Sequence, residues 1–145
     1  MKEQRIKQII DFTFEFRRGF SQFIEKKTGL TFAQWRVMKV IKANEGIITA
    51  KEVADILNSD RVTTSDIVNR LEKKNFINKI IDVKDKRKKL LNITEYAHTF
   101  CKNVMCLEEQ YINQLLANTN STEAEDFFRI MDLMKENIED NKTEV

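Results

Sequence analysis

Proline is absent from this 145-residue sequence, and glycine occurs only three times. Because these residues interrupt helices and supply flexible linkers, their scarcity predicts long helices without a linker or a low-complexity segment. The sequence also lacks any run of about 18 apolar residues that would span a bilayer, and its charged start lacks the apolar centre of a signal peptide. We therefore expect no membrane association and a cytoplasmic protein. Its 41% apolar residues suffice for the core of one domain.

Cysteine and histidine are also scarce. Cys101 and Cys106 lie about 140° apart around one expected helix, so they cannot readily bridge each other. We interpret them as small apolar residues in a reducing compartment, against the alternative of a redox switch. The single histidine, His98, makes no metal-ligand cluster and no catalytic pair, and there is no glycine-rich phosphate loop. The sequence thus predicts no metal site, no cofactor and no enzyme.

Basic residues are concentrated in one segment. Residues 68–91 hold nine Lys or Arg against three Asp or Glu, a local charge of +6, which leaves −4 for the rest of the chain. From Ser121 onward, eight acids stand against three bases. Local basicity of this kind indicates a polyanionic partner for residues 68–91, whereas the C-terminal segment is expected to avoid nucleic acid.

Apolar periodicity predicts six helices and a hairpin, and therefore a mainly α (α+β) fold. Thr31 to Gln34 has the form of a capping box, and Asn75 can adopt the left-handed conformation that ends a helix. The helices are expected over residues 3–27, from Thr31 to about Asn44, from Thr49, from Asp60 to Asn75, from Thr94 to about Asn118, and from Asn120. Residues 76–82 and 89–93 are the expected strands of the hairpin, and Ile47–Ile48 is a further, very short strand.

The first expected helix is apolar on more than one side. Five of the ten phenylalanines lie between Phe12 and Phe23. One neighbouring helix cannot cover so much apolar surface, so the sequence predicts that a second copy of the chain covers the remainder.

The order of the central elements is that of a winged helix-turn-helix, with the hairpin as the wing. The helix from Asp60 buries one face, and its opposite face presents mostly short polar side chains that suit the major groove. Its N-terminal end also carries partial positive charge and N–H groups that favour phosphate. The predicted DNA-contacting residues on this helix are Arg61, Val62, Thr63, Ser65, Asp66, Asn69 and Arg70.

The turn of the hairpin holds five basic residues and two aspartates between Ile81 and Leu91. A charged hairpin alone is often a solvated turn, and a polar helix face alone is usually solvent-facing. Their order and spacing together favour nucleic-acid binding. An acid facing DNA opposes binding, so we interpret Asp85 as orienting Arg87. The predicted phosphate contacts of the wing are Lys84, Lys86, Arg87, Lys88 and Lys89.

Three segments resemble the MarR (multiple antibiotic resistance regulator) family of winged-helix transcription factors. They are "LTFAQWRVMKVI" (30–41), "RLEKKNFI" (70–77) and "DVKDKRKKLLNITE" (82–95), and the resemblance spans nearly all of residues 1–145. It implies a DNA-binding lobe at 31–93 and an obligate homodimer formed by 1–30 and 94–145. It also implies that the fourth helix enters the major groove of a pseudo-palindromic operator. Arg87 would reach into the adjacent minor groove, held by Asp85.

The resemblance further implies a mode of regulation. The first helix lacks the reactive cysteine of thiol-sensing members, and one histidine does not make a zinc sensor. A small aromatic or phenolic ligand, bound between the dimer helices and the winged lobe, is the remaining mode. Candidate pocket residues are Phe12, Phe16, Phe20, Trp35 and Met38, and the alternative that each is simply a core residue stays open.

The expected function is therefore a repressor that binds specific sites on double-stranded DNA as a homodimer. The alternative is a helical protein-protein adaptor that docks a partner on its winged-helix surface. The two differ in whether the chain binds DNA.

Overall fold

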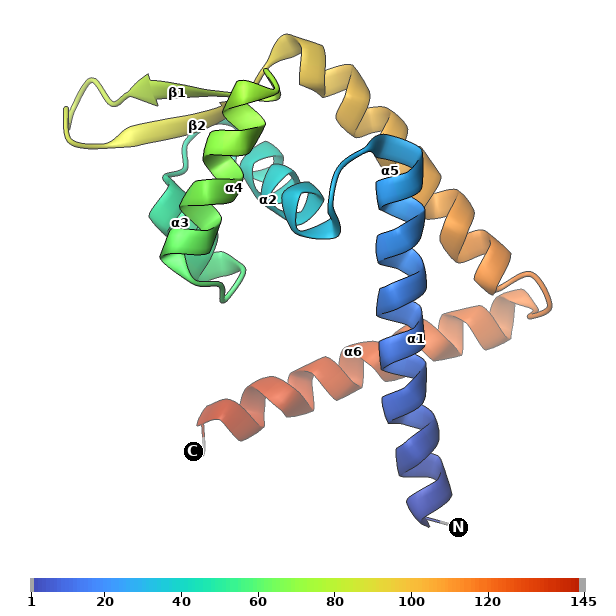
Figure 1. Cartoon of the computed structure of the whole chain (residues 1–145). Coiled ribbons are helices and arrows are strands. Elements are labelled where there is room, and N and C mark those ends of the chain that lie inside the picture. Colours follow the sequence, from blue (N-terminus) through green and yellow to red (C-terminus); the bar gives the residue numbers. More distant parts are fainter. Residues whose placement is uncertain (1, 144–145) are drawn as a thin grey trace. The chain divides into compact units, whose positions relative to one another are not determined.

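A computed structural model describes residues 2–143 of the chain (Figure 1). The mainly helical fold with a two-stranded wing, predicted from the sequence, is confirmed. The chain divides into two compact units, one that ends at Glu108 and one that begins at Glu109. The elements are α1 (Lys2–Thr28), α2 (Phe32–Ala43), α3 (Ala50–Ile56), α4 (Arg61–Lys73), β1 (Ile77–Ile81), β2 (Lys89–Ile93), α5 (Glu95–Leu115) and α6 (Ser121–Thr143).

Side-chain caps mark the starts of α2, α3 and α4. The predicted capping box of α2 is confirmed: Thr31 Oγ1 accepts from the Gln34 N–H, and Gln34 Oε1 accepts from the Thr31 N–H, both at 3.1 Å. Thr49 and Asp60 each accept from the backbone N–H three residues on, and so cap α3 and α4. Asn75 follows α4 with a φ of 60°, the left-handed conformation that the sequence predicts.

The core of the first unit is built around α2. Trp35, Met38 and Ile41 have no exposed surface, and α2 contacts α1, α3, α4 and β2. From α4, Val68 and Leu71 turn into this core, as their spacing predicts. Because α4 buries this one face, its opposite face is left to solvent.

The wing is anchored at its base and extends from the lobe. β1 and β2 pair antiparallel in a register that runs from Ile77 with Ile93 to Ile81 with Lys89. At the base, Ile77, Leu91 and Ile93 are buried. The turn that joins the strands projects away from α2, α3 and α4 (Figure 1). The wing turn is therefore available to a partner.

The predicted short strand at Ile47–Ile48 is wrong. These two residues belong to no strand, although the Ile48 carbonyl accepts one hydrogen bond from the Leu91 N–H at 2.8 Å. Gly46 has a φ of 77°, and Thr49 already caps α3. Only two residues therefore lie between a turn and a helix, which is too short a segment for a ladder of hydrogen bonds.

The second unit contains the end of α5 and all of α6. The regular part of α5 ends at Leu115, slightly before the predicted end near Asn118. Beyond it, N–H groups donate to carbonyls three residues back instead of four, as the Thr119 N–H does to the Leu116 carbonyl at 3.0 Å. Asn120 and Glu123 form a reciprocal cap at the start of α6, with two bonds of 2.9 Å. Within residues 2–143, no helix combines the length and apolar character needed to cross a membrane.

Candidate nucleic-acid interface

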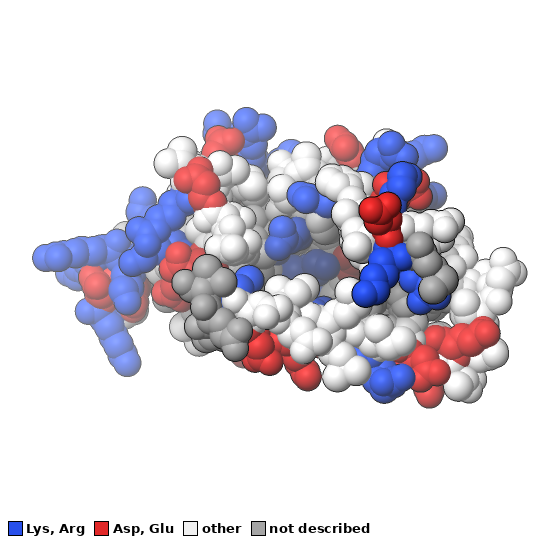
Figure 2. All heavy atoms as spheres, turned by 90° about the horizontal axis from the view of Figure 1, so that it is seen from below, with Lys and Arg blue, Asp and Glu red and all other residues white. Residues whose placement is uncertain are grey.

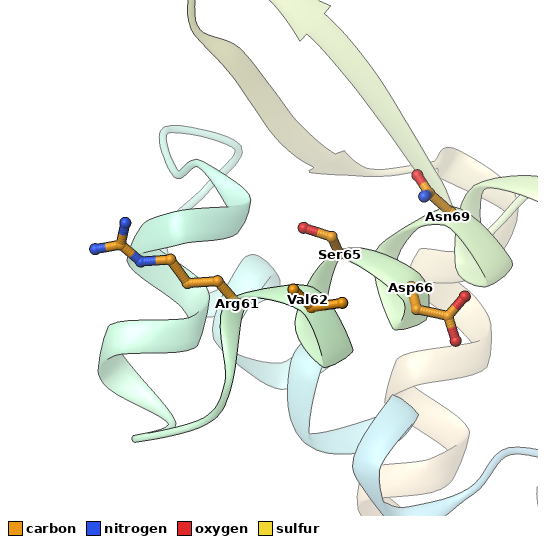
Figure 3. Close-up of a pocket in the computed structure, with 5 residues that line it drawn as sticks. All are labelled: Arg61, Val62, Ser65, Asp66 and Asn69. Carbon is orange, nitrogen blue, oxygen red and sulfur yellow. The ribbon is translucent and has the colours of Figure 1, made fainter.

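The solvent-facing side of α4 forms the first part of the candidate interface. Val62, Ser65, Asp66 and Asn69 share this side because they follow the helical spacing of i, i+3, i+4 and i+7. Together with Arg61 they line a shallow hollow along the helix (Figure 3). All seven predicted DNA-contacting residues of α4 are exposed: Arg61, Val62, Thr63, Ser65, Asp66, Asn69 and Arg70.

At the start of α4, the Thr63 side chain is hydrogen-bonded to the N-cap residue, Asp60. Asp60 Oδ2 accepts from the Thr63 N–H at 2.9 Å and from the Thr63 hydroxyl at 2.8 Å. These bonds, the backbone one first, lower the pKa of the Asp60 carboxyl below its ordinary value. Because a hydroxyl has one proton, Thr63 can only accept a hydrogen bond from a base edge in this arrangement.

Asp66 and Arg70 form an ion pair on the same side of α4. Asp66 Oδ2 lies 3.1 Å from Arg70 Nε, and both side chains are exposed. An exposed pair at this spacing stabilises a helix by only about 0.3–0.5 kcal/mol. Its larger consequence is electrostatic, because Arg70 offsets the negative charge that Asp66 would otherwise present to a phosphate.

A lysine from the wing also reaches this side of α4. Lys79 of β1 donates from Nζ to Asn69 Oδ1 at 2.6 Å, and the same Nζ lies 3.4 Å from Glu72 Oε1. Sequence reasoning did not include Lys79 among the DNA-contacting residues. The contact depends on how β1 packs against α4, and a local sequence pattern does not reveal this packing. The one sequence feature that pointed to Lys79 was its position within the basic segment 68–91.

The two aspartates of the wing turn both bind main-chain groups. Asp82 Oδ1 accepts from the Lys84 N–H, and Asp85 Oδ1 accepts from the Arg87 N–H, each at 3.0 Å. The Asp85 carbonyl also accepts from the Lys88 N–H at 2.9 Å. Asp85 thus fixes the backbone of Arg87, whereas the sequence interpretation had not specified which group of the arginine it would hold.

The wing turn concentrates positive charge. The side chains of Lys84, Lys86, Arg87 and Lys88 are all exposed there. In Figure 2, Lys and Arg gather at the left, where the wing projects, and a few acidic side chains lie among them. A projecting turn of this charge attracts a polyanion.

The predicted ligand-pocket residues fall into two groups. Phe12, Phe16 and Phe20 form a ladder along α1, with successive ring centroids 5.9 Å apart. Phe12 is exposed and Phe20 is buried, so the ladder leads from solvent toward the core. Trp35 and Met38 are fully buried. Ligand binding by these five residues stays a prediction.

Trp35 also takes part in a polar link between α2 and α5. Its Nε1 donates to Glu108 Oε1 at 2.6 Å, and Lys39 Nζ donates to the same oxygen at 2.8 Å. The Lys39 ammonium lies 5.6 Å from the centroid of the Trp35 ring, within the range of a cation–π contact. The sequence patterns gave no signal for this link.

The cysteines differ in their surroundings. Cys101 is buried and Cys106 is exposed, and burial raises the pKa of the Cys101 thiol. Among residues 2–143, no three His, Cys, Asp or Glu side chains are grouped as they would be to hold a metal ion.

Comparison with known proteins gives one family match. The model of the MarR family matches residues 28–88, which extend from the end of α1 to the wing turn. None of the curated proteins matches the chain significantly. The family resemblance that the sequence motifs indicated is confirmed by this match.

Solved structures share the fold along most of the chain. A MarR family protein from Bacillus stearothermophilus is 14% identical with a TM-score of 0.79, covering 94% of this chain and 95% of that one. A MarR/EmrR family transcriptional regulator from Acinetobacter sp. ADP1 is 21% identical with a TM-score of 0.74, covering 96% and 97%. Wild-type MarR from E. coli, in its apo form, is 19% identical with a TM-score of 0.75, covering 88% and 95%.

Proposed function

We propose that this chain, whose residues 28–88 match the model of the MarR family, is a MarR-type, sequence-specific DNA-binding regulator of transcription. The observation that supports this most strongly is the pairing of an exposed polar side of α4 with a basic wing on one lobe. A helix of this kind fits the major groove, and a basic hairpin beside it can follow the phosphate backbone.

In this proposal, α4 recognises bases. Ser65 and Asn69 hydrogen-bond to base edges, and Arg61 and Arg70 pair with guanine or phosphate. Val62, whose side chain is 78% exposed, contacts the methyl group of thymine, the one apolar group at a base edge in the major groove.

The wing binds the DNA backbone. Lys84, Lys86 and Lys88 neutralise phosphates, and each contact releases counterions, so binding weakens as salt rises. Arg87 enters the adjacent minor groove. The hydrogen bond from its N–H to Asp85 restricts the main chain there, which lowers the entropy that Arg87 loses on binding.

We further propose that the chain acts as a homodimer. Several apolar side chains of α1 and α6 are exposed, and a second copy would cover them. Residues 1–30 and 94–145 form the dimerisation region in this proposal, and residues 31–93 form the DNA-binding lobe. A two-fold dimer demands a pseudo-palindromic operator with half-sites about one helical turn apart. The exposed side chains are Ile6, Ile9, Ile10, Phe12 and Phe14 on α1, and Phe127, Phe128, Ile130, Leu133, Met134 and Ile138 on α6.

Repression and its release complete the proposal. A regulator that occupies its operator blocks transcription, and a small aromatic or phenolic ligand releases it. Release requires that the ligand bind more tightly to a dimer whose two α4 helices have the wrong spacing for the operator. The ladder of Phe12, Phe16 and Phe20 offers the aromatic surface for such a ligand.

A gel shift with DNA from the chain's own promoter region, titrated against salt, tests this function. We expect binding that weakens steeply with salt, by a species of twice the 17.2 kDa chain mass in light scattering. An intact dimer that does not bind DNA, or an affinity indifferent to salt, would contradict the proposal and favour a protein-protein adaptor.

A further inference from the structure

The wing holds the side chain of Asn69 in one orientation. The Lys79 ammonium donates to Asn69 Oδ1 at 2.6 Å and lies 3.4 Å from Glu72 Oε1. Asn69 and Glu72 are three residues apart on α4, so Lys79 bridges two neighbouring positions of one helix. The amide of Asn69 lies at the end of the hollow next to the strands (Figure 3).

This orientation limits what Asn69 can offer to a base. An asparagine that turns freely pairs with adenine through two bonds, one accepted by its oxygen and one donated by its NH2 group. Here the oxygen is bound to a cation, and the positive charge of Lys79 repels a second donor from that side. The NH2 group, which only donates, is what Asn69 presents to a base.

We propose that Lys79 is a positioning residue for base recognition: by holding Asn69 Oδ1, it makes α4 favour guanine or thymine at the base that Asn69 faces. In the major groove guanine offers two acceptors, O6 and N7, and thymine offers O4, whereas cytosine offers only the N4 donor. Adenine N7 also accepts, but the neighbouring adenine N6 donates and finds no free acceptor on an Asn69 whose oxygen is bound to Lys79. This inference rests on the proposed function of α4 as the DNA-recognising helix.

Lys79 differs in its surroundings from the lysines of the wing turn. Its side chain is only 24% exposed, and both of its partners lie on α4. Lys84, Lys86 and Lys88 are exposed at the projecting turn. Lys79 is therefore better placed to orient a neighbouring side chain than to reach a phosphate, and its replacement should alter which base is preferred.

Selection of bound sequences from a random DNA pool tests the inference with the full-length protein. Asn69→Ala identifies the base pair that Asn69 faces, because this variant loses the preference at one position of each half-site. The wild type should favour guanine or thymine there. Lys79→Met, which retains the length of the side chain without its charge, should raise the frequency of adenine at that position at least about fivefold. Preferences at the other positions should not change.

Three further variants control the selection. Lys79→Arg retains a cationic donor and should retain the wild-type preference. Lys102→Met removes one positive charge from α5, which contains none of the candidate interface residues, and should select the same bases as the wild type. Asn69→Asp replaces the donating NH2 group by an oxygen and should move the base preference toward cytosine or adenine. This variant tests the inference even if the Lys79 variants are too unstable to use.

Different results overturn different parts of the inference. If Lys79→Met weakens binding to all sequences alike, or lowers the melting temperature with unchanged base preferences, Lys79 has only a structural role. A wild-type preference for adenine at the position of Asn69 would also overturn the inference, as would an Asn69→Ala variant that keeps every preference. If the wild type enriches no sequence at all, the proposed function itself fails.

Discussion

Glu108 accepts two hydrogen bonds that join α5 to α2, and replacing it by alanine removes both. Its Oε1 lies 2.6 Å from Trp35 Nε1 and 2.8 Å from Lys39 Nζ. Trp35 has no exposed surface, so Glu108→Ala leaves the indole N–H without its partner inside the protein. Lys39 is partly exposed and can turn to water instead.

The size of the loss follows from these two environments. A buried donor without its partner costs about 1–3 kcal/mol, and a partly exposed ion pair contributes at most about 1 kcal/mol. We therefore expect Glu108→Ala to lower the free energy of unfolding by about 2–3 kcal/mol. For a chain of this length, such a loss corresponds to a fall in melting temperature of roughly 4–12 °C.

Urea unfolding followed by fluorescence is a suitable assay, because Trp35 is the one tryptophan of the sequence. Two variants separate the contributions. Lys39→Met removes the ion pair and the cation–π contact with Trp35 but keeps the indole hydrogen bond, so it should lose about 1–2 kcal/mol at most. Glu108→Gln retains an acceptor for the indole and should lose no more than about 1 kcal/mol. If Glu108→Ala loses no more stability than Lys39→Met, the hydrogen bond between Trp35 and Glu108 does not contribute measurably to the free energy of unfolding.

Three other outcomes are expected. Replacing thymine by uracil in a selected operator removes only the methyl group of the base. At the position that faces Val62, this replacement should weaken DNA binding several-fold for the wild type but not for Val62→Ala. Equal losses of affinity in both proteins would exclude the methyl contact. Arg87→Ala should weaken DNA binding several-fold at an unchanged melting temperature, and a drop in melting temperature large enough to explain the weaker binding would rule out a direct role in the minor groove. Iodoacetamide should label Cys106 before Cys101 in the folded protein, because burial raises the pKa of the Cys101 thiol; mass spectrometry that finds equal rates would contradict this.

The helices and the hairpin could be predicted because their signals are local. The Thr31 capping box, the Asp60 cap and the left-handed Asn75 each depend on residues within one turn of the chain. The apolar spacing of α4 likewise determined which side would be buried, and hence which side would be exposed. The short strand expected at Ile47–Ile48 failed because a run of two β-branched residues does not reveal how little room the neighbouring turn and cap leave.

Contacts between elements could not be predicted from local patterns. Trp35 and Glu108 are 73 residues apart, and Asn69 and Lys79 meet only because β1 packs against α4. The sequence likewise marked Asp85 as an orienting residue, but which atom of Arg87 it would bind depends on the shape of the turn. Side-chain roles at the candidate interface therefore follow from the fold, and the DNA contacts themselves stay predictions.

The salt dependence of binding tests most directly whether α4 and the wing bind DNA. The measurement compares the slope of log affinity against log salt for the wild type and for a variant with Lys84, Lys86 and Lys88 replaced by methionine. With two wings in a dimer, six lost phosphate contacts should reduce the slope by about five. A control variant changes Lys102, Lys135 and Lys142, outside the candidate interface, and should retain the wild-type slope. Equal slopes for the wild type and the wing variant would contradict the account.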